Sequence, residues 1–247
     1  MRIRMPPSEI LGRADHRPWP LPDRPWIQRQ SWLDFTFLHW RVDPAVIRRC
    51  VPEPLALDLR DGAAWVGVIP FRMAGVTLRG MPDIPGFSAF HELNVRTYVT
   101  WEGKPGVYFL SLDADQALAV FAARAWFGLP YRHAQQTSVA QGDRFAYRSR
   151  RTDGGPEARF AAEWTVGAPR APDAHERWLC ERYALFVVER GRVRRGDVHH
   201  APWPIHDLNI TIEENTMTAP WGFETPGAPD HAMFSPGVDT VLWNLSP

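Results

Sequence analysis

The segment from Phe90 to Thr100, FHELNVRTYVT, alternates between apolar and polar side chains. Successive side chains of a β-strand point to opposite faces of a sheet, so this alternation predicts a strand. Apolar runs flank the segment, which favours a central position in a sheet. One row of the predicted strand consists of His91, Leu93, Val95, Thr97 and Val99, and the opposite row consists of Glu92, Asn94, Arg96, Tyr98 and Thr100.

The polar row is costly in a central strand. Glu92 and Arg96 would lose hydration on burial unless they were paired or faced a polar cavity. Two interpretations stay open. The row could form a ligand site inside a barrel, where perturbed ionisable groups often gather, or it could belong to a structural network of ion pairs.

The same periodicities predict the other elements. We expect further strands over 32–42, 55–59, 64–73, 107–112, 145–151, 158–166, 183–188 and 193–200. We expect helices over 43–50, with Asp43 as the cap, over 113–127, with Asp113 as the cap, and over 175–182. Turns are predicted at Asp61-Gly62 and at 102–106, and the chain after about residue 217 is predicted to be rich in loops.

Many short strands, few helices and long loops rich in proline and glycine favour an α+β fold that is mainly antiparallel β, a barrel or a sandwich with a few flanking helices. Residues 1–30 contain many prolines and arginines, which predicts an extended arm that is neither helix nor central strand. Its tryptophans favour packing over the body. Residues 31–247 are then expected to form a single domain.

Composition narrows the function. The chain of 247 residues has 28 basic and 28 acidic residues, and this balance argues against nucleic acid as the main partner. The sequence shows neither a signal peptide nor an apolar run long enough to cross a membrane, so we expect a soluble cytoplasmic protein. Cys50 and Cys180 fit reduced thiols. Lys104 is the only lysine, and it falls in a predicted turn.

No sequence motif for binding a nucleotide, a metal or a catalytic serine is present. His199, His200 and His206 form a histidine cluster, but their spacing matches no ligand pattern, so packed or hydrogen-bonded imidazoles are the default interpretation. Glu213-Glu214 is interpreted as a solvated face. We therefore expect neither a metal nor another cofactor.

Seven segments together resemble the YqjF-like family of bacterial proteins of unknown function, within the acetoacetate decarboxylase-like superfamily. They are HWRVDPAVIRRCVPEPLALD, DGAAWVGVIPFRM, FHELNVRTYV, KPGVYFLSLDAD, ARAWFGLPY, CERYALF and VHHAPWPI, which span roughly residues 30–210. The resemblance implies a cone-shaped antiparallel β-barrel with a cavity.

The chain more distantly resembles the acetoacetate decarboxylases. The run 51–55, VPEPL, is similar to a decarboxylase motif, and Leu112-Asp113 followed by ALAV at 117–120 matches the opening of a decarboxylase helix. In that family the helix leads to Pro-Lys-Lys, whose first lysine forms a Schiff base. Here the corresponding residues are Pro130-Tyr131-Arg132.

This difference removes the covalent route, because a phenol cannot form an imine with a keto acid. (Acetoacetate decarboxylase is a standard example of an activated lysine.) The active-site arginine of the decarboxylases has no clear match, since Leu33 falls near its position. Their glutamate aligns with Glu92, although the flanking residues differ.

Three hypotheses follow. In the first, the barrel binds a small molecule that carries a carboxylate: Arg96 or Arg132 binds the carboxylate, Asn94 and Tyr131 orient the ligand, and Glu92 accepts a hydrogen bond. The polar row also places Tyr98 in this ligand-binding set. In the second, Glu92 is a general acid or base of a lyase, isomerase or hydratase without covalent catalysis. In the third, the polar residues are structural and the chain works through a protein interface, with a homo-oligomer as one possibility.

Overall fold

A computed structural model describes residues 4–82, 88–116 and 128–247 of the chain. The strands are β1 (Gln28–Val42), β2 (Ala56–Leu57), β3 (Ala64–Leu78), β4 (Phe90–Trp101), β5 (Lys104–Ala114), β6 (Tyr131–Gln141), β7 (Arg144–Arg151), β8 (Arg159–Arg170), β9 (Ala184–Glu189), β10 (Arg192–His200), β11 (Ile205–Asn215) and β12 (His231–Leu242). The described helices are α1 (Pro7–Leu11), α2 (Pro44–Arg48), α4 (Ala174–Cys180) and the 3-10 helix η1 (Ala219–Trp221). The expected mainly antiparallel β fold with few helices is confirmed.

The strand pairings form two closed circuits that share one wall. The shared wall consists of β12, β1, β3, β4 and β5 in that order. Strands β9 and β10 close the first circuit between β5 and β12, and β6, β7, β8 and β11 close the second circuit between the same two strands. The pairings of β5 with β6 and β9 are parallel, whereas the other pairings of these strands are antiparallel.

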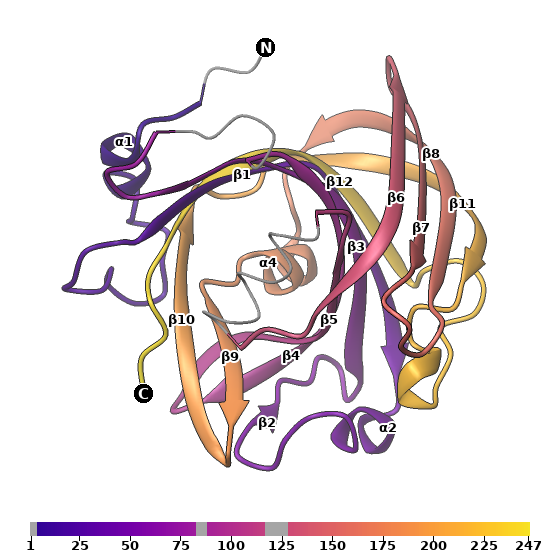
Figure 1. Cartoon of the computed structure of the whole chain (residues 1–247), viewed down its shortest axis with the longest axis horizontal. Helices are drawn as coiled ribbons and strands as arrows, with labels where there is room; N and C mark the ends of the chain where they lie inside the picture. Colours follow the sequence, from indigo (N-terminus) through magenta and orange to yellow (C-terminus); the bar gives the residue numbers. More distant parts are fainter. Residues whose placement is uncertain (1–3, 83–87, 117–127) are drawn as a thin grey trace.

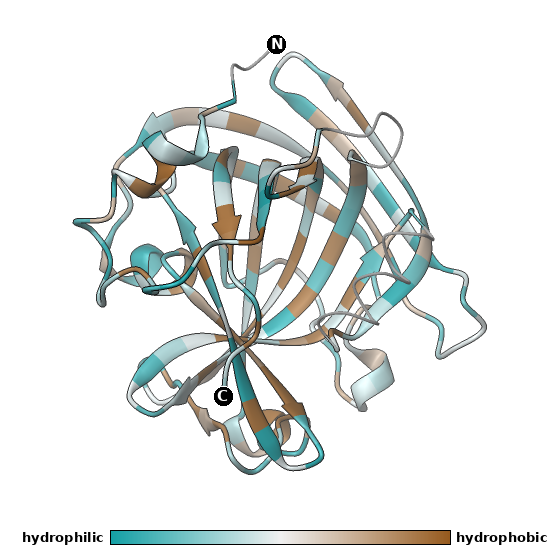
Figure 2. Cartoon of the chain, turned by 60° about the vertical axis from the view of Figure 1, so that its left-hand side comes forward, coloured by the Kyte–Doolittle hydropathy of each residue, from teal (hydrophilic) through white to brown (hydrophobic). Residues whose placement is uncertain are grey.

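Alternation along the shared wall fills both circuits with side chains. The first circuit contains Phe35, Phe37, Ile69, Phe71, Leu112 and Trp203. The second circuit contains Leu38, Val66, Val68, Phe160, Ala162 and Trp164. Helix α4 lies within the ring of the first circuit (Figure 1), where Leu179 and Cys180 join its core. The alternation of apolar and polar residues along the strands is visible in Figure 2.

Several local predictions are confirmed. The Asp43 carboxylate accepts a hydrogen bond from the Ala45 backbone at 2.7 Å and caps α2, with Pro44 at the first helical position. Asp173 and Glu176 form a capping box at the start of α4. The predicted turn at Asp61-Gly62 has positive φ at both residues, as a tight hairpin turn requires.

Strand β12 corrects the prediction of a loop-rich C-terminal region. It pairs with β1 over most of its length and also with β10 and β11. Pro236 and Gly237 within it are typical of loops, but Pro236 is exposed and Gly237 has a φ of +117°. The missing donor is tolerated because the β1–β12 pairing skips the position of Pro236, between the pairs Leu33–Gly237 and Phe35–Ser235, without a change of register.

Three other expectations also need correction. Asp113 does not cap a helix, because it lies within β5; the rest of the helix expected over 113–127 falls almost entirely outside the described residues. The strand expected over 55–59 is reduced to β2, which pairs with β4 rather than with β3. No strand was expected at Tyr131, which opens β6.

The N-terminal arm contains a helix, contrary to expectation. Helix α1 begins at Pro7, where a proline's missing N–H group is harmless because no helical carbonyl precedes it. Ile10 of α1 packs with Val241 and Trp243, so the arm covers the body as expected. Within the described residues, no helix is long and apolar enough to span a membrane.

Candidate functional site

The polar row of β4 faces the interior of the first circuit. Its members Phe90 and Tyr98 belong to the first core, whereas Leu93 and Val95 of the opposite row belong to the second. Four polar side chains of this row are 7% exposed or less, namely Glu92, Asn94, Arg96 and Tyr98. Burial on this scale requires hydrogen-bond partners, since an unpaired polar group in an apolar interior is costly.

Glu92 has a tyrosine as its partner. The Tyr131 hydroxyl, from the first residue of β6, donates a hydrogen bond to Glu92 Oε2 at 2.9 Å. Burial raises the pKa of Glu92 to about 8, with the nearby Asp113 adding to the rise and the Tyr131 hydrogen bond opposing it. Burial also raises the pKa of Tyr131 well above its ordinary value. Glu92 therefore holds its proton at a higher pH than an exposed carboxyl group does, and Tyr131 stays protonated.

Arg96 has no carboxylate partner. Among the described residues, no acidic side chain lies within ion-pair distance of its guanidinium, so Glu92 and Arg96 do not form an ion pair. Its Nη2 atom donates to the Leu179 carbonyl of α4 at 3.2 Å and to the Tyr98 hydroxyl at 3.4 Å. A buried arginine without a counterion is unusual, because desolvation of the charge is left uncompensated.

Tyr98 joins the strand to α4 and to β1. Its hydroxyl donates to the Leu179 carbonyl at 3.0 Å, and His39 Nε2 lies 2.7 Å from the same oxygen. Because that hydroxyl hydrogen is used by Leu179, His39 Nε2 is the donor of the second bond. Burial, followed by the charge of Arg96, lowers the pKa of His39 well below its ordinary value.

The interior of the first circuit leaves several polar atoms unpaired. In the part of the chain that the structure describes, four buried atoms there have no hydrogen-bond partner: Asn94 Oδ1, Arg96 Nε, His39 Nδ1 and Trp203 Nε1. Two of them are acceptors and two are donors. A molecule with both kinds of group would satisfy them.

Arg132 lies apart from the other predicted site residues. Tyr131 and Arg132 are neighbours on β6, so they face opposite sides of the sheet. Arg132 Nε lies 2.6 Å from Asp153 Oδ2 in an ion pair at the rim of the second circuit. The structure thus brings together Glu92, Asn94, Arg96, Tyr98 and Tyr131 but not Arg132.

Residues that the sequence reasoning missed complete the site. His39 follows Phe35 and Phe37 at alternate positions of β1, and this spacing could have placed it on the interior face. The Leu179 carbonyl lies in the last turn of α4, where helix carbonyls lack intrahelical partners. No sequence pattern indicates which side chains would reach that carbonyl.

The histidine cluster is structural. His199 Nε2 lies 2.9 Å from the Ile10 carbonyl, and His200 Nδ1 lies 2.8 Å from the Ala201 carbonyl. His206 Nδ1 contacts the Gly167 carbonyl at 3.1 Å. No group of three or more histidine, cysteine, aspartate or glutamate side chains among residues 4–82, 88–116 and 128–247 is placed to hold a metal ion.

The single lysine is remote from Glu92. Lys104 begins β5 beside the β4–β5 turn, and Ala114, the register partner of Glu92, ends the same strand. Ten residue positions of strand separate them, a distance of roughly 33 Å. The side-chain amine of Lys104 therefore does not reach Glu92.

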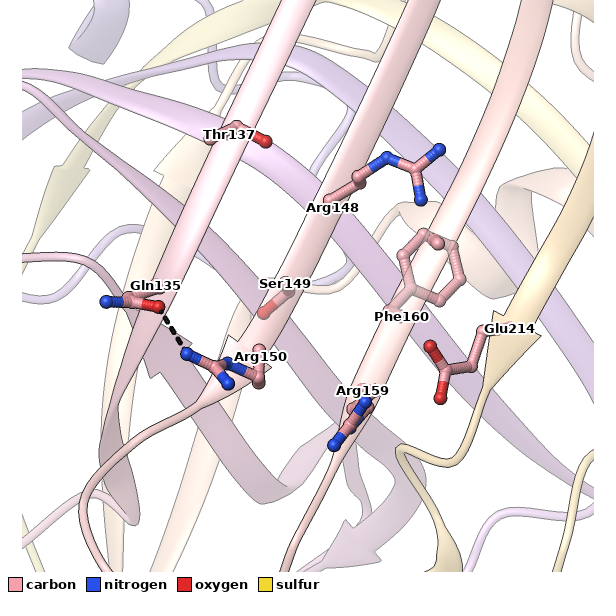
Figure 3. Close-up of a pocket in the computed structure, with 9 residues that line it drawn as sticks. Gln135, Thr137, Arg148, Ser149, Arg150, Arg159, Phe160 and Glu214 are labelled. Atoms are coloured by element: carbon pink, nitrogen blue, oxygen red, sulfur yellow. Dashed lines mark hydrogen bonds between the residues drawn. The ribbon is translucent and has the colours of Figure 1, made fainter.

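A shallow recess of about 270 Å³ lies on β6, β7, β8 and β11 (Figure 3). Arg148, Arg150 and Arg159 line it. Arg150 donates to the Gln135 side chain at 2.8 Å, and Arg148 pairs with Glu213 at 2.8 Å. This pairing supports the interpretation of Glu213 as part of a solvated face. Because the charges are largely compensated and exposed, the recess is a weaker candidate site than the first circuit.

Comparison with known families assigns the chain. The model of the DUF2071 family, described as an uncharacterized conserved protein family, matches residues 29–239. The chain belongs to the DUF2071 family. The chain is similar in sequence to the uncharacterized protein YqjF of Bacillus subtilis (strain 168). The two are 41% identical over 227 residues, which cover 91% of this chain and 94% of that protein. The resemblance to YqjF-like proteins seen in the sequence is confirmed.

This DUF2071 chain is less similar to the acetoacetate decarboxylases in sequence than to YqjF. The similarity in structure, however, extends over nearly the whole chain. An acetoacetate decarboxylase of Ralstonia nicotianae (strain ATCC BAA-1114 / GMI1000) is 31% identical over 97 residues, 39% of this chain and 34% of the enzyme. The acetoacetate decarboxylase of Legionella pneumophila (subsp. pneumophila str. Philadelphia 1) is similar in structure with a TM-score of 0.58 at 14% identity, covering 96% of this chain and 95% of that one. The acetoacetate decarboxylase-like fold is therefore confirmed.

A further structural neighbour is the enduracididine biosynthesis enzyme MppR in complex with pyruvate. The TM-score is 0.63 at 17% identity, and the match covers 97% of this chain and 93% of MppR. Identity at this level supports the shared fold and no more.

Proposed function

We propose that this protein binds a small molecule carrying a carboxylate inside the first circuit. The observation that carries the proposal is Arg96, a buried guanidinium with an unpaired Nε and no acidic partner among the described residues. The comparably buried Arg151 is paired through two of its nitrogens with Asp113 at 2.9 Å. A ligand carboxylate would supply Arg96 with the counterion that Arg151 already has.

The neighbouring groups suit the rest of such a ligand. Asn94 Oδ1 is an unpaired acceptor two residues from Arg96 on the same face, so it would accept from a ligand hydroxyl or amine. Glu92 and Tyr131 lie farther along the strand and would contact a second oxygen of the ligand. The aromatic side chains of the first core would contact its apolar part.

The structural neighbours are consistent with this class of ligand. Pyruvate, the molecule in the MppR complex, is a small carboxylate. The distance between Lys104 and Glu92 argues that any chemistry here is not that of an amine-catalysed decarboxylase.

The test is a thermal-shift series with small keto acids, hydroxy acids and lipophilic carboxylates, each compared with its neutral amide. At about 100 times Kd a ligand adds roughly 2.7 kcal/mol, which for a chain of this size raises Tm by several degrees. We expect acids to raise Tm and amides to have little effect.

Two variants locate the binding. Arg96→Met should abolish the shift and Arg96→Lys should retain part of it, because lysine keeps the charge without the paired donors. Arg132→Met, on the opposite face of β6, is the control and should respond like the wild type. Equal shifts with acids and amides, or a full shift in a folded Arg96→Met protein, would contradict the proposal.

A second candidate function is acid–base catalysis by Glu92 on the bound acid, in a lyase, isomerase or hydratase reaction. The observation that favours it is the pKa of Glu92 of about 8, close to the working pH of an efficient general acid or base. An activity found among the binding acids should titrate near this pKa and be lost in Glu92→Gln. A pH–rate profile that is flat between about pH 6 and 9 would exclude Glu92 from this role.

A further inference from the structure

The opposite face of β4 carries a second group of polar residues, at the rim of the second circuit. His91 Nδ1 lies 2.8 Å from Asp115 Oδ2, and the His91 backbone N–H donates to Asp115 Oδ1 at 3.0 Å. The two bonds hold the imidazole in one orientation. Both side chains are about a quarter exposed, so they can be reached from solvent.

The tautomer of His91 follows from its partner. A carboxylate only accepts hydrogen bonds, so Nδ1 of His91 must carry the hydrogen that points to Asp115. In the neutral imidazole Nε2 is then an acceptor, with no hydrogen of its own. The dyad presents this acceptor on the side away from Asp115.

Two more acceptors without partners lie in the same circuit. The ring of Tyr147 on β7 meets that of His91 edge-on, with centroids 6.2 Å apart, and Tyr147 is 2% exposed. Among the described residues its hydroxyl has no hydrogen-bond partner, and the same is true of Gln136 Oε1 on β6. The Gln136 amide nitrogen is used, since it donates to the Asp113 carbonyl and to Ser149.

The charge of this region is negative. Asp113 is balanced by Arg151, but no arginine or lysine among the described residues lies within ion-pair distance of Asp115. Burial raises the pKa of Tyr147 well above its ordinary value, and the nearby Asp115 carboxylate adds to the rise. A cation would be favoured here over a neutral molecule or an anion.

We propose that the His91–Asp115 dyad, Tyr147 and Gln136 form a second site, which binds the ammonium group of a small primary amine. An ammonium group has three N–H donors and no acceptor, and it would meet three acceptors: His91 Nε2, the Tyr147 hydroxyl oxygen and Gln136 Oε1. Asp115 supplies the compensating charge.

The two sites lie on opposite faces of β4, and their charged side chains have opposite sign. Arg96 points into the first circuit without an acidic partner among the described residues, and Asp115 lies beside β4 on the other side with no arginine or lysine partner among them. The protein would thus take an acid on one side of β4 and an amine on the other, and each site can be tested without the other.

The experiment uses n-butylammonium, 1-butanol and butyrate, which have chains of equal length and different charge. The amine is protonated at neutral pH, as a lysine side chain is. Binding is followed by the ¹⁵N imidazole signals of His91, assigned by their loss in His91→Gln, in protein labelled at histidine. We expect saturable shifts with butylammonium, at least about tenfold weaker binding of butanol, and no effect of butyrate on these signals.

Asp115→Asn removes the charge and Tyr147→Phe removes only the hydroxyl, so each should weaken butylammonium binding by about tenfold or more. Asp207→Asn, which removes an exposed carboxylate of β11 that pairs with Arg170, is the control and should leave this binding unchanged. The proposal is overturned if the His91 signals do not respond to butylammonium, if butyrate shifts them equally, or if the amine binds folded Asp115→Asn and Tyr147→Phe as it binds the wild type. Loss of carboxylate binding in Arg96→Met bears only on the first site.

Discussion

Glu92 shows how one buried side chain couples the interior of the barrel to pH. Its carboxyl has no cation beside it among the described residues, and its bond from Tyr131 does not offset the loss of hydration. The neutral acid is therefore the form that the first circuit stabilises. A neutral carboxylic acid can both donate and accept a hydrogen bond, which an ionised one cannot.

This state predicts a specific dependence of stability on pH. The pKa of Glu92 is about 8 in the folded protein against an ordinary value of 4.5, so the folded state binds the proton more tightly than the unfolded state. The stabilisation is fully present below pH 4.5 and is lost as the pH rises through 8, at up to about 1.4 kcal/mol per pH unit.

Glu92→Gln should remove this dependence, because the amide keeps the shape and a hydrogen bond but does not titrate. Urea unfolding of the wild type and of Glu92→Gln from pH 5 to 9 measures the pH dependence of the unfolding free energy. The wild type should lose stability relative to the variant as the pH rises. Parallel curves for the two proteins would show that Glu92 is ionised throughout and that its pKa is not raised.

At the level of elements, β12 depends on a glycine. Gly237 has a φ of +117°, and a Cβ atom there would come within 2.0 Å of the Trp32 carbonyl oxygen on β1. Both the backbone conformation and the close approach exclude a side chain. Because β12 belongs to both circuits, a distortion of its backbone at Gly237 would disturb the strand pairing of both.

We expect Gly237→Ala to destabilise the protein by at least about 3 kcal/mol, from backbone strain and the clash together. Gly103→Ala is the matched control: Gly103 also has positive φ, but nothing lies within 4 Å of its added Cβ, so only about 1 kcal/mol should be lost. Equilibrium unfolding of the two variants gives the comparison. Similar losses at both positions would mean that β12 can move away from β1 without cost.

At the level of the whole molecule, one ion pair joins the shared wall to the strands that close the second circuit. Asp113 of β5 and Arg151 of β7 are both almost fully buried, and Arg151 also donates to Ser111. The two strands are not neighbours in the sheet, since β6 lies between them. The pair therefore ties β5 of the shared wall directly to β7, past the intervening β6.

Removing one partner should be costly, since the other charge would stay buried and unpaired. We expect Asp113→Asn and Arg151→Met each to lose about 3–5 kcal/mol of unfolding free energy. The double variant Asp113→Leu with Arg151→Met should lose much less than the two single losses added together. Additive losses in denaturant unfolding would show that the two side chains do not act as a pair.

Much of the fold could be predicted because its signals are local. The alternation of β4, the caps of α2 and α4 and the tight turn at Asp61-Gly62 depend on residues only a few positions apart. Strand β12 could not be predicted in the same way, because Pro236 and Gly237 are typical of loops and only the partner strand shows that the pairing continues past them.

The candidate site likewise has features that could be predicted from the sequence and features that depend on the tertiary structure. The sequence by itself determined which residues of β4 share a face, that the only lysine sits at a turn, and which family the chain resembles, since each of these is a property of order along the chain. Tertiary structure decided that Tyr131 reaches Glu92 while Arg132 turns away. It also decided that Arg96 has no acidic partner among the described residues and that β4 lies in the wall shared by the two circuits. These depend on contacts between segments distant in sequence and on the burial that those contacts create, and no local pattern encodes either.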